Sequence, residues 1–306
     1  MAVDLENDLI LVTAASGKQG GALLPFLART WKRLRLQCVS DSSRERLHQQ
    51  YPHAEIVQTD FADLASARRL MQGVTACVLV TPAFHPRESH YGLNMIDAAA
   101  ESLRSGGLFK HLVLSSVLHS CLRALANHDN KRFVEEALIE SILPYTIVQP
   151  SHVMENVPVT AIAKQDSPVF HARFDPATKF SFSTVYDLGE AISNILRDRD
   201  QHLYAVYPLV STPEPLNYYE AMDILSARIG KQVQIQRLTM EDITKGFATT
   251  IPSNTNDDDR KAILRAFGRL MVYYDTRGLI GNAKVLELVL GRKPLGYREW
   301  VDMQLK

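Results

Sequence analysis

The chain has 306 residues, 46% of them hydrophobic and 22% charged, which is enough to bury a sizeable core without disulfides. Its 34 basic and 34 acidic residues cancel, which argues against general nucleic-acid binding and against a polybasic membrane anchor. No apolar run reaches the roughly 18 residues of a membrane span. The first residues carry acids where a secretory signal carries bases. We therefore expect a cytoplasmic protein with neither nucleic acid nor membrane as its partner.

The three cysteines, Cys38, Cys77 and Cys121, lie far apart and form no CxxC pair. Cys38 and Cys77 stand in apolar runs, so we expect reduced thiols in the core. The His, Asp and Glu residues show no spacing typical of metal ligands, and we expect no metal site.

Short apolar runs alternate with amphipathic segments through the first half of the chain. The runs are about five residues long and rich in Val, Ile and Leu, as is typical of parallel strands that are buried on both faces. They are Leu9–Thr13, Leu34–Val39, Ala54–Gln58, Ala76–Thr81, His111–Ser115 and Tyr145–Gln149. Helical spacing is found between them at Gly20–Arg29, Asp63–Met71, Tyr91–Leu103 and Lys131–Ile142. This alternation predicts an α/β fold with a doubly wound parallel sheet.

The pattern changes near residue 150, where we place a domain boundary. Residues 151–306 are expected to form a smaller α+β lobe, and part of 180–210 is expected to return to the first sheet. Phe170–Thr184 alternates and is interpreted as an irregular hairpin-like region. Further helices are predicted at Asp187–Leu196, Asn217–Ile229, Asp257–Leu270 and Ala283–Leu290, and strands at Leu203–Pro208 and Gln232–Gln236.

The segment Thr13–Gly21 follows the first strand and opens a helix, which is the context of a dinucleotide-binding loop. Gly17 would let the backbone approach a pyrophosphate, and Gly20 would let the helix pack closely on the strand. Ala14 replaces the first glycine and is expected to avoid positive φ. An ordinary turn is the alternative, but the six alternating strands favour a Rossmann domain over residues 1–150 that binds NAD(P).

Several segments resemble the NmrA-like family, a group of atypical short-chain dehydrogenases/reductases. Thr13–Gly21 (TAASGKQGG) resembles the family's TGATGxQGG, and Leu143–Asn156 (LPYTIVQPSHVMEN) resembles LPYTILRPGFFMEN. The other matching segments are Val57–Phe61, Ala76–Phe84, Leu114–Val117, Asn127–Glu136 and, more weakly, Tyr186–Glu190. The resemblance is specific over residues 9–157. It implies that the second domain is a small, variable substrate lobe.

The resemblance implies an NADP(H) cofactor, because the family holds the 2′-phosphate with an Arg after the second strand. Here that position is Ser40, but the hydroxyls that follow, together with Arg44 and Lys18, also suit a phosphate monoester. Asp41 favours the alternative, an unphosphorylated NAD ribose, and Asp41–Ser43 could equally be a helix cap. We favour NADP(H). The predicted cofactor residues are Thr13, Ala14, Ser16, Gly17, Lys18, Gln19, Gly20, Ser40, Asp41, Ser42, Arg44, Asp60, Phe61, Thr81, Pro82, Ala83, Phe84, Ser115, Lys131, Pro150, His152 and Val153.

Short-chain dehydrogenases use Ser, Tyr and Lys, with Tyr four residues before Lys. Lys131 matches the family lysine, and Ser116 stands at the expected strand end, but Asn127 replaces the tyrosine. Lys131 is expected to bind ribose hydroxyls or donate a proton, and to contribute little to the core because it lies at the edge of a cleft. His128 and His152 are further candidates for proton transfer, and each could instead be a structural histidine.

Taken with the resemblance, these residues predict an NADP(H)-dependent oxidoreductase that reduces C=C, C=N or C=O bonds of a medium-sized organic molecule in secondary metabolism. A cyclase or isomerase that uses the cofactor transiently is one alternative. A redox sensor that binds NAD(P) without turnover and contacts a protein partner is the other, and the missing tyrosine is compatible with it.

Overall fold

A computed structural model describes residues 2–253 and 255–306 of the chain. These residues divide into two compact units. The first unit comprises the residues up to Ala83, together with Arg87–Pro150 and Val185–Pro208. The second comprises Phe84–Pro86, Ser151–Thr184 and the described residues of Leu209–Lys306.

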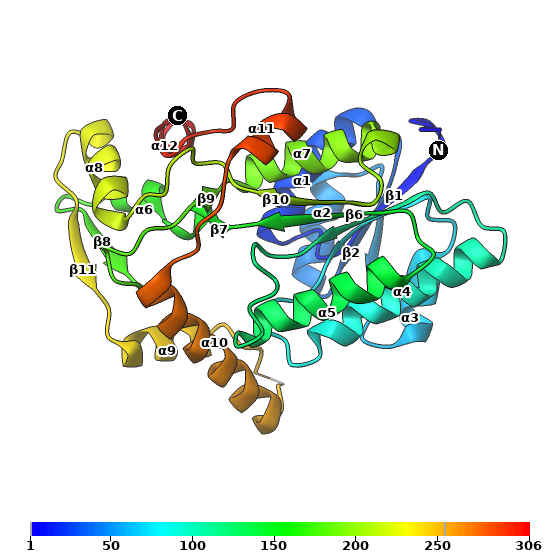
Figure 1. The fold of residues 1–306 in the computed structure, drawn as a ribbon, viewed down its shortest axis with the longest axis horizontal. Coiled ribbons are helices and arrows are strands. Elements are labelled where there is room, and N and C mark those ends of the chain that lie inside the picture. The colour runs from blue at the N-terminus through cyan, green and yellow to red at the C-terminus, as the bar shows by residue number, and fades with distance from the viewer. Residues whose placement is uncertain (1, 254) are drawn as a thin grey trace. The chain divides into compact units, whose positions relative to one another are not determined.

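A seven-stranded sheet with the strand order β10-β6-β5-β4-β1-β2-β3 forms the centre of the first unit (Figure 1). Its strands are β1 (Leu9–Val12), β2 (Arg33–Cys38), β3 (Glu55–Gln58), β4 (Ala76–Val80), β5 (His111–Ser115), β6 (Tyr145–Pro150) and β10 (Ala205–Leu209). Its helices are α1 (Lys18–Thr30), α2 (Asp41–Gln50), α3 (Leu64–Met71), α4 (Glu88–Arg104), α5 (Ala126–Glu140) and α7 (Val185–Arg197), with a 3-10 turn at Arg199–Gln201.

The strands β1 to β6 pair in parallel, as the apolar runs predict. Residues from both faces of β1 are buried, because α1 and α7 cover one face of the sheet while α3, α4 and α5 cover the other (Figure 1). Helices α1 and α7 approach closely at Gly189, where a Cβ atom would lie 2.8 Å from the Ala22 carbonyl oxygen. The α/β fold with a doubly wound, Rossmann-like sheet is therefore confirmed.

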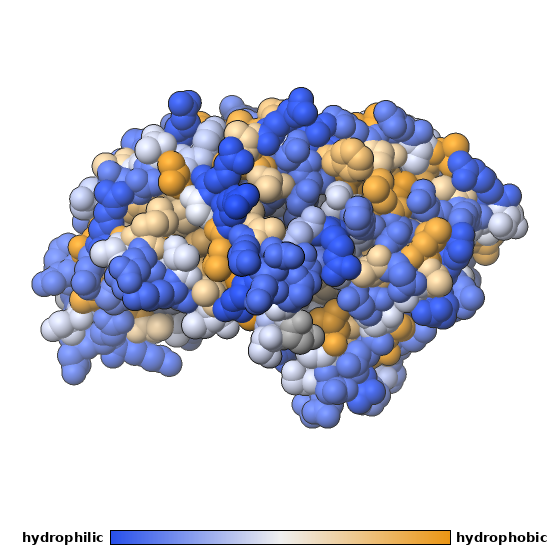
Figure 2. All heavy atoms as spheres, turned by 90° about the horizontal axis from the view of Figure 1, so that it is seen from below, coloured by the Kyte–Doolittle hydropathy of each residue, from blue (hydrophilic) through white to orange (hydrophobic). Residues whose placement is uncertain are grey.

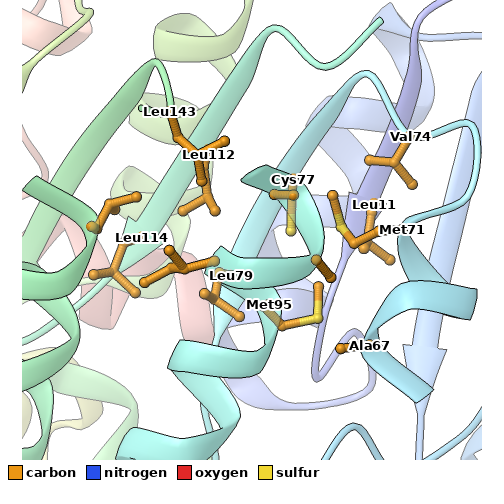
Figure 3. Close-up of a cluster of buried hydrophobic side chains, with 14 of the residues drawn as sticks. Leu11, Ala67, Met71, Val74, Cys77, Leu79, Met95, Leu112, Leu114 and Leu143 are labelled. Atoms are coloured by element: carbon orange, nitrogen blue, oxygen red, sulfur yellow. The ribbon is translucent and has the colours of Figure 1, made fainter. Parts of the chain in front are cut away.

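A hydrophobic core cluster lies between the sheet and helices α3 to α5 (Figure 3). Leu11, Cys77, Leu79 and Leu112 point from the strands towards the helical layer, where Met95 of α4 packs among them (Figure 3). Cys38 and Cys77 are buried free thiols, as expected, and burial raises the pKa of both.

A buried polar network lies at the amino-terminal edge of the same sheet. Asp8 accepts hydrogen bonds from Arg199 at 2.8 Å and from Lys110 at 2.7 Å. His111 Nε2 lies 2.8 Å from Thr146 Oγ1, whose proton is donated to the His202 carbonyl oxygen. His111 Nε2 must therefore carry the ring proton, and Nδ1 is a buried acceptor without a hydrogen-bond donor among the described residues.

The second unit contains short strands and six α-helices in its described part. The strands are β7 (His152–Val153), β8 (Val169–Ala172), β9 (Phe182–Ser183) and β11 (Gln234–Arg237). The helices are α6 (Val159–Ala163), α8 (Tyr218–Ile229), α9 (Met240–Ala248), α10 (Asp257–Arg277), α11 (Lys284–Leu290) and α12 (Tyr297–Gln304), with a 3-10 turn at Met154–Asn156.

The expected hairpin-like region at 170–184 is wrong. Strand β8 pairs in parallel with β11, and β9 pairs in parallel with β7, so the two strands of this segment do not pair with each other. The alternation of apolar and polar residues along the segment indicates that one face is buried, but it does not show which strand is the pairing partner. By contrast, α8 begins with a capping box at Asn217 and ends at Gly230 in the left-handed region, as its sequence predicts.

Among the described residues, large apolar side chains such as Leu108, Val272 and Leu288 are exposed at separate positions along the chain. On the face shown in Figure 2, apolar atoms are dispersed among hydrophilic ones. Within residues 2–253 and 255–306, no helix is both long enough and apolar enough to cross a membrane.

Candidate functional site

The predicted site residues of the first unit follow the carboxyl ends of neighbouring parallel strands. Because strands β1, β2, β4, β5 and β6 are parallel, their carboxyl ends share one edge of the sheet. The loops after these strands are the usual binding edge of a doubly wound sheet. The predicted site residues accordingly lie in the segments that begin at Thr13, Val39, Thr81 and Ser116, and at Pro150, the last residue of β6.

Thr13 fixes the start of the first loop. Its hydroxyl donates to the Val80 carbonyl oxygen at 2.8 Å and accepts from the Val80 amide at 2.7 Å. The side chain is fully buried, so Thr13 ties β1 to β4 and presents no free donor to a ligand.

Ala14 adopts a φ of +47°, and the expectation that it avoids positive φ is wrong. A left-handed alanine costs roughly 1 kcal/mol, so neighbouring contacts must maintain this conformation. The buried side chain of Gln37 does so: Oε1 accepts from the Ala14 amide at 2.8 Å, and Nε2 donates to the Thr59 carbonyl oxygen at 2.6 Å. Sequence reasoning missed Gln37, because a lone polar residue in a strand gives no sign of such a contact.

The amino end of α1 is arranged for a close approach. Gly17 is its N-cap, no side chain caps the helix, and its first turn holds no acidic residue. Helices α2 and α3 are capped by Ser40 and Asp63 instead. A Cβ atom on Gly20 would lie 2.6 Å from the Ala14 carbonyl oxygen, so only glycine fits there. An uncapped helix end without acids attracts an anion.

Ser40, Ser42 and Ser43 bring three hydroxyls together after β2. Ser40 Oγ lies 3.3 Å from Ser42 Oγ and 2.9 Å from Ser43 Oγ, and it caps α2 by accepting from the Ser43 amide. The cap is therefore Ser40, one residue before the predicted Asp41–Ser43. Arg44 pairs loosely with Asp41 at 3.5 Å, on the exposed side of α2.

Arg46 was not predicted. Its Nη2 donates to the Ser16 carbonyl oxygen at 3.1 Å, and this bond ties α2 to the glycine loop. No sequence motif marks Arg46, because its role depends on the direction in which the second turn of α2 points its side chains.

Asp60 and Phe61 follow β3. Asp60 accepts a hydrogen bond from the Tyr91 hydroxyl at 3.2 Å, and the buried Phe61 ring packs edge-on against Tyr91 with centroids 5.1 Å apart. Burial, with the Asp60 charge beside it, raises the pKa of Tyr91 to about 12. The two residues therefore support the start of α4.

Lys131 lies in a buried cluster, and the expectation that it contributes little to the core is wrong. Its Nζ donates to Thr81 Oγ1 at 2.7 Å and to the Ser115 carbonyl oxygen at 3.2 Å, and it lies 3.0 Å from Glu88 Oε1. The Thr81 hydroxyl also donates to Glu88 Oε1, at 2.8 Å. The Glu88 side chain is fully buried and that of Lys131 is 11% exposed. All three ammonium protons thus have an acceptor.

Glu88 is the main residue that the sequence did not reveal. An acid in the first turn of a helix is ordinarily an exposed complement to the helix dipole, and nothing near Glu88 in the sequence indicates burial. Only one of its carboxylate oxygens is bonded: Oε2 is buried and has no hydrogen-bond partner among the residues that the structure describes.

The cluster connects directly to the glycine loop. Ser115 Oγ donates to Gln19 Oε1 at 2.8 Å, while the Ser115 carbonyl oxygen receives the Lys131 ammonium. Gln19 and Lys131, which are 112 positions apart by their numbers, thus share one residue at the end of β5.

Two further polar atoms near the end of β5 and the start of α5 are buried without a partner in the described chain. They are Ser116 Oγ and Asn127 Oδ1. His128, predicted in a loop, lies instead in the first turn of α5, where its Nδ1 is 2.9 Å from the His119 carbonyl oxygen. Burial lowers the pKa of His128, so the ring is neutral at pH 7. This contact matches the structural alternative for His128.

The remaining predicted residues lie in two places. Pro82 and Ala83 follow Thr81 in the first unit, and Pro150 ends β6 and accepts from the Leu118 amide at 2.9 Å. Phe84, His152 and Val153 belong to the second unit. There Phe84, with a φ of +64°, packs edge-on against the stacked rings of Phe247 and Phe267.

His152 lies in an aromatic environment in the second unit. Its Nε2 is 3.1 Å from the Tyr218 hydroxyl, and its ring has Phe174, Phe180 and Phe182 within 5.7 Å, centroid to centroid. Burial raises the pKa of Tyr218 well above its usual value, so the phenol is neutral. Its hydroxyl can then either donate or accept the hydrogen bond with His152, depending on the histidine tautomer. Val153 pairs with Ser183 in the two-stranded β7–β9 sheet.

No group of three or more His, Cys, Asp or Glu side chains in the described part of the chain is placed to hold a metal ion.

The sheet order and the glycine-containing turn after β1 define a Rossmann-type α/β class of protein. The sequence model of the NmrA-like family matches residues 6–287, and the chain therefore belongs to this family. No curated protein sequence matches the chain.

Solved structures with the same fold span nearly the whole chain. An NADPH-dependent quinone oxidoreductase of Escherichia coli, solved with NADPH, is 21% identical, with a TM-score of 0.74 over 97% of this chain and 100% of that one. A triphenylmethane reductase of Citrobacter sp., solved with NADP(H), is 18% identical, with a TM-score of 0.74 over the same shares. The negative transcriptional regulator NmrA, solved with NADP, is 16% identical, with a TM-score of 0.71 over 96% of this chain and 94% of that one.

Proposed function

We propose that the first unit binds NADP(H) along the carboxyl edge of its sheet, and that the protein is an oxidoreductase acting on a medium-sized organic molecule. Secondary metabolism, with alkaloid, terpenoid or polyketide substrates, is the setting that we infer. The single observation that carries the proposal is the uncapped, acid-free amino end of α1 behind a loop in which Gly20 leaves no room for a side chain.

The polar atoms along this edge fit such a cofactor. Ser116 Oγ and Asn127 Oδ1 are buried at the end of β5 and the start of α5 and have no partner in the described residues. A buried polar atom without a partner costs roughly 1–3 kcal/mol, which a ligand hydroxyl or amide would relieve. Ser40, Ser42 and Arg44 supply hydroxyls and a cation after β2, where the adenosine end of the cofactor would lie.

The bound cofactor would supply the hydride, and the protein would orient the cofactor and transfer a proton to the substrate. Asn127 stands four residues before Lys131 and has no ionisable proton, so the usual tyrosine role passes to another group. Lys131 is the nearest candidate on the same helix. Its longest hydrogen bond, 3.2 Å to the Ser115 carbonyl oxygen, is the one that a ribose hydroxyl would displace. His128 is neutral and bonded to backbone, which makes it a weaker candidate.

A planar, apolar acceptor is supported by two of the similar structures. The second unit is rich in aromatic side chains, but Phe174, Phe180 and Tyr274 around His152 are buried and pack on one another. The names of the similar proteins, a quinone oxidoreductase and a triphenylmethane reductase, describe substrates of the planar, apolar kind. A cyclase or isomerase acting on such a molecule is the alternative within the same pathway type.

A regulator that binds NAD(P) without turnover is the second candidate, and one observation favours it. All three protons of Lys131 are already engaged within the protein, so the only ammonium in the described cluster has no free donor for a substrate. The similar structure of NmrA, a negative transcriptional regulator, is compatible with this reading.

The test separates binding from turnover. Calorimetry should show that NADPH binds more tightly than NADH. The rate of NADPH oxidation is then measured with each member of a panel of quinones, enones, iminium ions and aldehydes. Oxidation of NADPH by one of these classes of compound supports the oxidoreductase. Tight binding without oxidation by any class, together with a protein partner captured only in the presence of NADPH, supports the regulator. A protein that binds neither cofactor refutes both.

A further inference from the structure

The buried pair of Glu88 and Lys131 is a neutral unit at the carboxyl edge of the sheet. Glu88 has no exposed surface, and its Oε1 is 3.0 Å from Lys131 Nζ. In an environment of low dielectric, a buried charge without its counter-ion acts strongly on any other charge nearby. The carboxylate therefore cancels a positive charge that would otherwise face whatever binds beside Lys131.

The two forms of the proposed cofactor differ by one positive charge at the nicotinamide ring. The oxidised ring is cationic and the reduced ring is neutral. An uncompensated Lys131 ammonium would repel the oxidised ring and leave the reduced ring nearly unaffected. The charge state of this edge therefore sets the relative affinity for NADP+ and NADPH.

We infer that Glu88 is a positioning residue that holds the Lys131 ammonium between Thr81 and Ser115 and, by cancelling its charge, lets the site accept the oxidised cofactor. The inference rests on the proposed binding of NADP(H) to the first unit. Thr81 belongs to the same hydrogen-bonded cluster, because its hydroxyl accepts from Lys131 and donates to Glu88 and thereby fixes both side chains. The second carboxylate oxygen of Glu88, buried and unbonded in the described chain, marks the carboxylate as placed for its charge more than for hydrogen bonding.

The test measures the affinities of NADP+ and NADPH for the whole protein by calorimetry at pH 7 and one ionic strength. Glu88→Gln keeps the shape and one acceptor oxygen but removes the charge. It should weaken NADP+ relative to NADPH by about tenfold, the order expected for two unit charges on the order of 10 Å apart within a protein. In the double variant Glu88→Gln/Lys131→Met the edge is neutral again, and the ratio should return to within about twofold of the wild-type value.

A matched control is available on α5. Glu135 is also buried, and it accepts from Ser120 at 2.8 Å and from Gln149 at 2.9 Å, with no cationic partner among the residues that the structure describes. Glu135→Gln makes the same chemical change in the same unit and should leave the NADP+/NADPH ratio unaltered. A merely structural role for Glu88 would lower both affinities together, and the removal of Lys131 would not restore the ratio.

A second variant covers the case in which Glu88→Gln does not fold. Glu88→Asp keeps the charge but withdraws it by one methylene, so both affinities should fall while their ratio stays within about twofold. The inference is overturned if Glu88→Gln leaves the ratio unchanged, if the double variant does not restore it, or if Glu88→Asp shifts it. If the wild-type protein binds neither form, the proposed function fails first, and this outcome is distinct from binding with an unchanged ratio.

Discussion

Removal of the Lys131 ammonium should destabilise the fold much more than the position expected for it, at the edge of a cleft, suggests. In Lys131→Met the Glu88 carboxylate stays fully buried, and among the described residues only the Thr81 hydroxyl remains as its donor. Breaking a buried pair from one side typically costs about 3–5 kcal/mol, because a charge is left uncompensated. We expect a loss in this range, which is a large part of the 5–15 kcal/mol of a typical domain.

The double variant Glu88→Gln/Lys131→Met should recover most of the loss, because a neutral pair of similar volume leaves no buried charge. Urea unfolding measures both, with unchanged m values as the sign that the same surface is exposed. Lys110→Met is the control: Lys110 pairs with Asp8, but Asp8 keeps Arg199 as a partner, so the cost should be under about 1 kcal/mol. The reasoning is refuted if Lys131→Met costs no more than Lys110→Met, or if the double variant is no more stable than the single one.

Three further predictions concern His111, Ala14 and the two arginines of α2. Burial, aided by the charge of Arg199, lowers the pKa of His111 to about 3, below its unfolded value near 6.5. The free energy of unfolding should therefore fall by up to about 1.4 kcal/mol per pH unit as the pH drops below 6.5. Denaturant unfolding at pH 7 and pH 5 measures this decrease, which should be absent in His111→Gln. Ala14→Gly should stabilise the protein by up to about 1 kcal/mol in chemical denaturation, since it relieves the positive φ, and a loss would contradict the strain. Calorimetry should show that Arg44→Ala weakens NADPH binding by about 1–3 kcal/mol and leaves NADH binding unchanged. Arg46→Ala loosens the glycine loop and should weaken the binding of both cofactors. Equal losses for the two cofactors in Arg44→Ala would show that Arg44 does not contact the 2′-phosphate.

The first sheet could be predicted closely because its central strands β1, β4, β5 and β6 are buried on both faces, so that their sequences are continuous apolar runs. The run His111–Ser115 is reproduced as β5 without a shift. Helix α2 was missed as an element because its face is mostly polar and only Leu47 is buried, so no apolar period marks it. Helix α12 was missed although Tyr297, Trp300 and Val301 are buried at helical spacing, because the helix has only eight residues and its period is too short to stand out.

The candidate site was predictable only where a motif fixes the backbone. Gly17 and Gly20 follow from the geometry that a phosphate loop needs. Glu88 and Gln37 could not be found in this way, because their roles depend on partners 43 and 23 positions away by their numbers. Ala14 shows the limit of a propensity argument: the bond from its amide to Gln37 and the close contact with Gly20 outweigh a preference of about 1 kcal/mol.

The central claim is that the glycine loop of the first unit binds NADP(H), and Gly17→Glu tests it most directly. The new carboxylate would lie at the amino end of α1, where the proposal places the pyrophosphate, and its Cβ atom would be 3.2 Å from the Ala14 carbonyl oxygen. Calorimetric titration with NADPH should give tight binding to the wild-type protein and none to a Gly17→Glu variant that still unfolds cooperatively. Unchanged NADPH affinity in that folded variant would contradict the account.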